Sequence, residues 1–155
     1  MRFPLHSRSV LRTGAAALLL CFAAGLAGCA SSTQLRVVSV RNLNSPTRDK
    51  GHRLSYRIIQ FKETPALAGT QFPAIWKQEK GALPGVVGDP IEGTFDPDTT
   101  ATVSIKKAAG AKTFAIIGNF YKPQGDCWFL IQDFGKRSTA VVTAGASCFT
   151  PGAGK

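Results

Sequence analysis

The cysteine at position 29 is the side chain of this sequence with the clearest chemical setting. It follows Leu26-Ala27-Gly28, at the end of an apolar run that begins at Gly14. Three arginines and no acidic residue precede that run. A basic start, a short apolar segment and small residues at a cleavage position are typical of a secretory signal peptide. The thiol directly after this site is a nucleophile that could be modified covalently.

This arrangement resembles a bacterial lipobox, which implies a covalent lipid. The Cys29 sulfur would carry a diacylglyceryl group, and its amino group would be acylated after cleavage. Leu26, Ala27 and Gly28 would be the residues that the signal peptidase recognises. The alternatives are a plain secretory signal and a transmembrane helix, although the run is short of the about 20 residues that a span needs. Ala30 stands where an aspartate would favour inner-membrane retention, so we expect the outer membrane.

Two further cysteines, Cys127 and Cys148, would remain in the mature chain. In an oxidising compartment such a pair predicts one disulfide. Two buried thiols or a metal site are the alternatives, but His52 is the one histidine after position 28. We therefore predict a disulfide between these cysteines, no metal site and no cofactor other than the lipid.

The sequence carries no arrangement of residues that is typical of catalysis. It lacks the H-E-x-x-H, G-x-S-x-G, P-loop and C-x-x-C motifs. Asp96 and Asp98 lie in a predicted proline-containing turn, which explains them better than a catalytic carboxylate pair does. Nothing in the sequence supports His52 and Cys127 as a base and a nucleophile. We expect a protein that binds or holds a partner, and not an enzyme.

Short apolar segments separated by turn residues predict the elements that must position these side chains. One helix of about two turns is expected between Thr70 and Gly81. The segment 54–61 is apolar on both faces toward its end, so we expect a central strand there. Nearly regular spacing of strands with one helical insert favours an antiparallel β-sandwich. Strands are expected over 35–41, 54–61, 91–95, 101–105, 113–121, 127–134 and 139–144.

The expected organisation is one domain between two short end segments. Residues 1–28 would be the cleaved signal peptide, 29–33 a leash to the lipid, 34–150 the sandwich and 151–155 a flexible tail. The last two long strands are predicted to form a hairpin around 135–138, with Cys127 and Cys148 facing each other across it. Cleavage would lower the formal net charge from +10 to +7, because residues 1–28 carry three arginines and no acid. A basic domain in this compartment favours anionic headgroups, lipopolysaccharide or an acidic protein face as its contact, and the alternative is a solvated basic surface that favours solubility.

Four segments are together similar to the outer-membrane lipoprotein of the type VI secretion system, the TssJ family. Leu43-Asn44-Ser45-Pro46 resembles the leucine-asparagine-proline loop of that family. Arg57-Ile58-Ile59-Gln60-Phe61 resembles the strand that follows the loop. The segment 114–121 is similar to a small-and-apolar strand ending in an aromatic residue, and Trp128 opens the next strand.

The resemblance implies an all-β, transthyretin-like sandwich with a short helical insert, anchored in the outer membrane and facing the periplasm. It implies a tether that binds the periplasmic C-terminal domain of the large inner-membrane component, the TssM family, with no nucleic acid and no small-molecule substrate. A pilotin or assembly chaperone for another secretion channel, or a wall-acting enzyme or inhibitor, are the alternatives. Since exposed loops on a rigid sandwich commonly carry binding, the expected partner-binding loop comprises Asn44, Ser45, Pro46, Thr47, Arg48, Asp49, Lys50, Gly51 and His52.

Overall fold

The computed structural model describes residues 32–45, 47, 50–77, 83–135 and 138–152. These residues form eight strands and one short helix. In chain order the elements are β1 (Ser32–Ser39), β2 (Leu54–Phe61), α2 (Phe72–Trp76), β3 (Val86–Phe95), β4 (Thr100–Lys106), β5 (Thr113–Gly118), β6 (Phe129–Asp133), β7 (Thr139–Ala144) and β8 (Phe149–Pro151).

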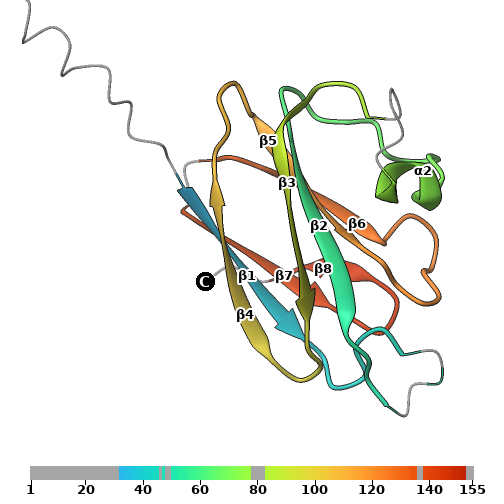
Figure 1. Ribbon diagram of the computed structural model, residues 1–155. Helices are drawn as coiled ribbons and strands as arrows, with labels where there is room; N and C mark the ends of the chain where they lie inside the picture. The colour runs from blue at the N-terminus through green and yellow to red at the C-terminus, as the bar shows by residue number, and fades with distance from the viewer. Residues whose placement is uncertain (1–31, 46, 48–49, 78–82, 136–137, 153–155) are drawn as a thin grey trace, which may run out of the picture.

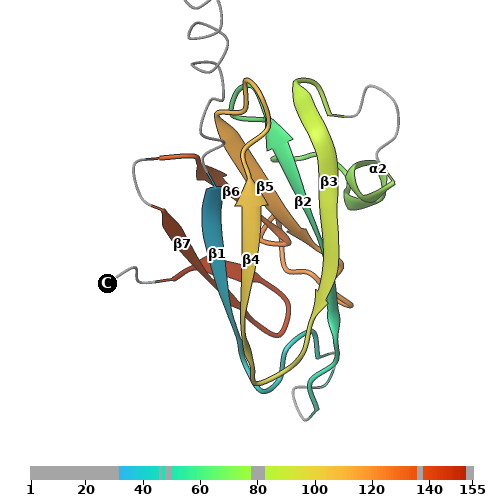
Figure 2. The ribbon, with the colours of Figure 1, turned by 60° about the vertical axis from the view of Figure 1, so that its left-hand side comes forward.

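The strands form two four-stranded sheets, ordered β4-β1-β7-β8 and β3-β2-β5-β6. The sheets pack face to face, and α2 lies on the outer side of the second sheet (Figure 2). The expected all-β, transthyretin-like sandwich with a helical insert is confirmed. The central position expected for 54–61 is confirmed as well, because β2 pairs with β3 on one side and with β5 on the other.

Successive strands run in opposite directions, so the connections alternate between the two ends of the sandwich (Figure 1). We call the end at which β1 begins the N-terminal end; the β2–β3, β4–β5 and β6–β7 connections lie there. We call the opposite end the loop end; it carries the β1–β2, β3–β4, β5–β6 and β7–β8 connections. β1 and β7 run in the same direction and are neighbours, so their pairing is parallel. All other strand pairs are antiparallel, as expected of an antiparallel sandwich.

The hairpin predicted over 127–144 is wrong. β6 pairs with β5 in one sheet, whereas β7 pairs with β1 and β8 in the other. The connection between β6 and β7 thus crosses from sheet to sheet. β1 begins at Ser32, and Pro151 belongs to β8, where it pairs with Val142.

Burial follows from the number of layers that cover each strand. β1 alternates between buried and less buried side chains, as a strand with one solvated face does. All six residues of β5 are buried, and β5 is a central strand of its sheet, paired with β2 on one side and β6 on the other. The predicted helix is confirmed but shorter than expected, as it ends at Trp76 with Ile75 as its buried residue.

Arg57 holds α2 to the outer face of β2. Its guanidinium donates a hydrogen bond to the carbonyl oxygen of Trp76, lies 5.1 Å from the centre of the Trp76 ring, and forms a 2.8 Å ion pair with Glu92. Phe72 packs edge-on against the buried Trp128, with ring centres 5.3 Å apart. Both tryptophans therefore pack in or against the core.

Candidate functional site

The structure describes part of what the sequence predicts as functional. Leu26, Ala27, Gly28 and Cys29 lie outside the described residues, as do Pro46, Arg48 and Asp49 of the predicted loop. The remaining loop residues lie at the loop end, between β1 and β2 (Figure 1). β1 begins at the opposite end of the sandwich and leads to this loop.

The base of the β1–β2 loop is closed by backbone hydrogen bonds around a buried leucine. Leu43 is fully buried, and its N–H donates to the carbonyl of Val40 at 3.0 Å. On the return side, the N–H of His52 donates to the carbonyl of Leu43 at 2.8 Å. The two ends of the loop are thus fixed to each other and to the core.

Asn44 clamps this loop to the β5–β6 connection. It has a left-handed backbone conformation, with φ of 50°, which asparagine tolerates better than most residues. Its side-chain amide donates to the carbonyl of Arg53 at 2.8 Å, and its side-chain oxygen accepts the N–H of Tyr121 at 2.6 Å. Asn44 and Ser45 are buried. These two predicted loop residues therefore form the base of the loop and not its exposed surface.

Gly51 lets the returning chain lie against the β3–β4 turn. A Cβ atom at this position would lie 2.3 Å from the Arg41 carbonyl oxygen and 2.7 Å from Cβ of Pro97. Such contacts are too short for any larger residue without a shift of the backbone. The turn itself, predicted from its proline and aspartates, is confirmed: the Thr99 hydroxyl donates to the Asp96 carbonyl at 2.8 Å.

The described exposed surface around the loop is polar and carries more basic than acidic groups. Thr47, Lys50 and His52 are exposed. Arg53 forms a 2.6 Å ion pair with Asp96, but both side chains are more than half exposed. Such surface pairs contribute little to stability, so these charges are available for a partner.

Cys127 and Cys148 form a disulfide with their Cα atoms 5.0 Å apart. Cys127 precedes β6 and Cys148 precedes β8, so the bond joins the two sheets at the loop end instead of crossing a hairpin. The N–H of Phe149 also donates to the carbonyl of Cys127 at 2.8 Å. Covalent and hydrogen bonds together hold β8, a strand of three residues, against the other sheet.

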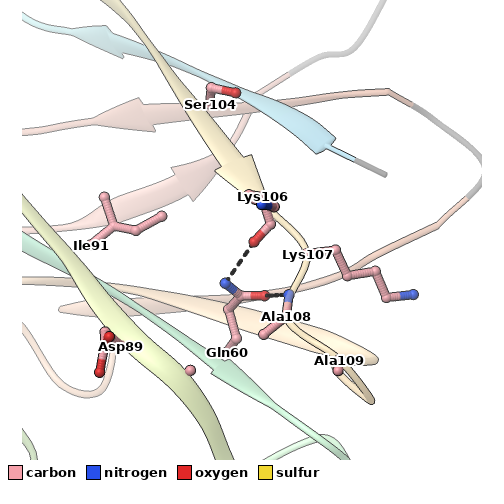
Figure 3. A pocket seen from close by; sticks show the side chains of 9 residues that line it. Gln60, Asp89, Ile91, Ser104, Lys106, Lys107, Ala108 and Ala109 are labelled. Carbon is pink, nitrogen blue, oxygen red and sulfur yellow. Dashed lines mark hydrogen bonds between the residues drawn. The ribbon is translucent and has the colours of Figure 1, made fainter. Parts of the chain in front are cut away.

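A groove of about 420 Å³ lies between the free edges of β3 and β4 (Figure 3). Ile91 comes from β3 and Ser104 and Lys106 come from β4. The buried Gln60 amide uses both of its groups to join the sheets: its NH₂ donates to the Lys106 carbonyl at 3.0 Å, and its oxygen accepts the Ala108 N–H at 2.8 Å. This buried polar group is used by the fold, and we assign no ligand to the groove.

Neither a metal site nor a membrane-spanning helix is found among the described residues. In this part of the chain, no three histidine, cysteine, aspartate or glutamate side chains are grouped so that they could hold a metal ion. None of its helices is long and apolar enough to cross a membrane.

Several solved structures share this fold. The Serratia marcescens protein Lip, a membrane-bound component of the type VI secretion system, matches with a TM-score of 0.69 and 15% identity over 79% of this chain and 98% of that one. The T6SS lipoprotein TssJ1 from Pseudomonas aeruginosa matches with a TM-score of 0.65 and 16% identity over 77% and 93%. This is the fold of the type VI secretion lipoproteins.

Two further matched chains come from other structures of the same secretion system. One belongs to a structure of the type VI membrane complex, with a TM-score of 0.69 and 13% identity over 78% of this chain and 97% of that one. Another comes from a structure of the T6SS protein TssM C-terminal domain from EAEC, with a TM-score of 0.64. Neither a protein-family model nor a curated protein sequence matches this chain. The shared feature is therefore the fold, which here carries little sequence identity.

The loop between β1 and β2 lies where the sequence predicts it. The sequence did not indicate that Tyr121, in the β5–β6 connection, is hydrogen-bonded to this loop. Tyr121 was treated as the aromatic end of a strand, yet β5 ends at Gly118 and Tyr121 lies in the following connection. The one available signal for this contact was Asn44 in a predicted turn, since a short amide side chain can form a hydrogen bond with a backbone group.

Proposed function

We propose that this chain is a TssJ-type lipoprotein that anchors the type VI secretion membrane complex at the outer membrane. The observation that carries the proposal is the match to Lip and TssJ1, which covers 98% and 93% of those chains. In this proposal the chain acts by holding a partner and performs no catalysis.

The anchor in this proposal is the lipid on Cys29, with a diacylglyceryl group on sulfur and an acyl group on nitrogen. Each buried methylene contributes about 0.8 kcal/mol, so two or three chains hold a small domain durably. Cys29 precedes the first residue of β1 by three positions. The N-terminal end of the sandwich would therefore face the membrane, and the loop end would face the periplasm.

The partner in this proposal is the periplasmic C-terminal domain of the TssM-type inner-membrane component. Support comes from two matched chains, which belong to structures of the type VI membrane complex and of the TssM C-terminal domain. The β1–β2 loop suits such a contact because its base is fixed by Leu43 and Asn44 while Thr47, Lys50 and His52 are exposed. A loop held in this way loses little conformational freedom on binding.

Two measurements test the anchor and the partner separately. For the anchor, cells expressing the wild type or Cys29→Ser are labelled with radioactive palmitate and fractionated. We expect label in the wild type alone, and loss of Cys29→Ser from the outer-membrane fraction. Unchanged labelling and unchanged fractionation of the variant would contradict the anchor.

For the partner, the detergent-solubilised lipoprotein is titrated with the purified TssM-type domain from the same bacterium. We expect binding by the wild type, and a strong loss of affinity when Arg48 and Lys50 are both changed to glutamate. A matched control changes Lys106 and Lys107 to glutamate at the N-terminal end, which should leave the affinity unchanged. Absence of binding by the wild type would refute the proposed partner.

A further inference from the structure

Tyr121 is a large side chain left in solvent at the loop end. It is 74% exposed, and among the described large hydrophobic residues Val86, at 39%, is the other exposed one. Val86 lies at the start of β3, at the N-terminal end. A single exposed hydrophobic residue needs no functional explanation by itself. What distinguishes Tyr121 is the way in which its backbone is held.

The backbone of Tyr121 is fixed on both sides. Its N–H donates to the side-chain oxygen of Asn44, and Asn44 is buried. The preceding residue, Phe120, is 5% exposed and packs edge-on against Phe149 with ring centres 5.0 Å apart. Phe120 is therefore directed into the core while Tyr121 is left in solvent. The exposed ring stands on a rigid base although it belongs to a connection between strands.

Asn44 also makes Tyr121 part of the same surface as the β1–β2 loop. The two hydrogen bonds of its side chain reach Tyr121 in one connection and Arg53 at the return of the other. A surface made of two loops that are already bonded to each other loses little entropy when a partner binds. Aromatic residues in such settings are the side chains that most often dominate the binding energy of an interface.

Charged side chains of both signs are exposed in the connections near this tyrosine, with Asp126 in the β5–β6 connection and Asp98 in the β3–β4 turn as acidic examples. Lys122 follows it and is exposed, and Arg53 and Lys50 are exposed on the β1–β2 side. Asp96, the acidic group bonded to Arg53, compensates for one of these charges. A complementary partner surface would offer an apolar pocket for the ring, with charged groups of both signs at its rim, including a carboxylate opposite Lys122.

We propose that Tyr121 is the central contact of a protein-docking surface formed jointly by the β5–β6 connection and the described part of the β1–β2 connection, and that it inserts into an apolar pocket with a charged rim on the partner. This inference rests on the proposed function for the identity of the partner. It adds the side chain that carries the affinity and the chemistry of the pocket that receives it.

The test measures binding of the purified periplasmic TssM-type domain to the detergent-solubilised lipoprotein by calorimetry. Tyr121→Ala should weaken binding by about 30-fold, the effect of losing one interfacial hot spot. Tyr121→Phe keeps the ring and should stay within about threefold of the wild type. Lys122→Ala should weaken binding at low salt and have little effect at high salt, as expected of a charge at the rim. Val86→Ala is the matched control and should bind like the wild type.

The outcomes separate this inference from the proposed function. If the Arg48 and Lys50 reversal abolishes binding but Tyr121→Ala binds like the wild type, the inference is overturned and the proposed partner stands. If the wild type does not bind the domain, both fail. If the wild type forms dimers that Tyr121→Ala abolishes, the surface serves a second copy of the chain and the proposed pocket on the TssM-type domain is wrong. Circular dichroism of each variant verifies that the sandwich is folded.

Discussion

The disulfide between Cys127 and Cys148 offers a sharp test of how this sandwich is held together. The bond joins the segment before β6 in one sheet to the segment before β8 in the other. We expect the double variant Cys127→Ala/Cys148→Ala to fold, with a lower free energy of unfolding. Removing both sulfurs avoids a free thiol that could form other disulfides.

The expected loss follows from the size of the loop that the bond closes. The cysteines are 21 positions apart. In the chain-entropy model, closing such a loop in the unfolded state is worth about 3 kcal/mol at 25 °C. For a domain of this size that corresponds to a fall of about 10 °C in Tm.

Urea unfolding followed by tryptophan fluorescence measures this difference. The wild type is unfolded with and without dithiothreitol, and the double variant serves as the control in which the reductant should change nothing. We expect the reduced wild type to match the variant. A variant with the same free energy of unfolding as the oxidised wild type would refute the argument that the bond restrains the unfolded chain.

Three further predictions concern single side chains. Asn44→Ala should lower the free energy of unfolding by about 2 kcal/mol, because two hydrogen bonds of about 1 kcal/mol each are lost; Asn44→Asp, which keeps the acceptor for Tyr121, should lose less in the same urea titration. Gly93→Ala should destabilise by about 1–3 kcal/mol, since its Cβ would lie 2.6 Å from the Tyr56 hydroxyl, whereas Gly135→Ala meets nothing within 4 Å and is the control. Burial raises the pKa of Tyr56 above 10.0, so the stability contributed by its neutral form is present below pH 10 and lost as the pH rises through that raised pKa. Unfolding curves from pH 8 to 11 should show a fall in the free energy of unfolding that is smaller in Tyr56→Phe, and an equal fall in both proteins would contradict the assignment.

The strands could be predicted largely because their burial pattern is local. The limits expected for the second strand, 54–61, are those of β2. Its apolar residues on both faces correctly indicated a central strand, since Ile58 pairs with Ile116 and Ile59 with Ala115. Period-two patterns and turn residues are read over a few positions and need no knowledge of the distant chain.

The pairing of β6 and β7 could not be predicted in the same way. A connection of a few residues between two strands is compatible with a hairpin, and equally with a crossing to the other sheet. The choice depends on β7 finding β1, where Val37 pairs with Val142. That contact joins positions far apart in the sequence, so no local pattern encodes it. The disulfide was predicted from the compartment and the cysteine count, and its geometry was predicted wrongly for this reason.

The candidate site shows the same division between local and distant information. An asparagine in a polar segment indicates a turn, and the turn is present. The hydrogen bond of Asn44 to Tyr121, by contrast, joins residues that are 77 positions apart, and the burial of Asn44 depends on such distant contacts. Sequence reasoning therefore assigned Asn44 to the exposed surface, although the fold uses it to fix the surface that Tyr121 shares with the loop.

The alternation of strand direction has a consequence for how a tether of this kind would work. β1 has eight residues, and at about 3.3 Å per residue it spans about 26 Å between the two ends of the sandwich. The proposed lipid would be attached just before β1, while Asn44 and Tyr121 lie just beyond its far end. The strand that begins at the membrane would therefore lead directly to the docking surface. β1 is also a central strand, paired with β4 on one side and β7 on the other. A force that pulls on the partner would act along β1, parallel to the strands. The backbone hydrogen bonds of β1 to β4 and to β7 would then resist the force together and would not open one at a time.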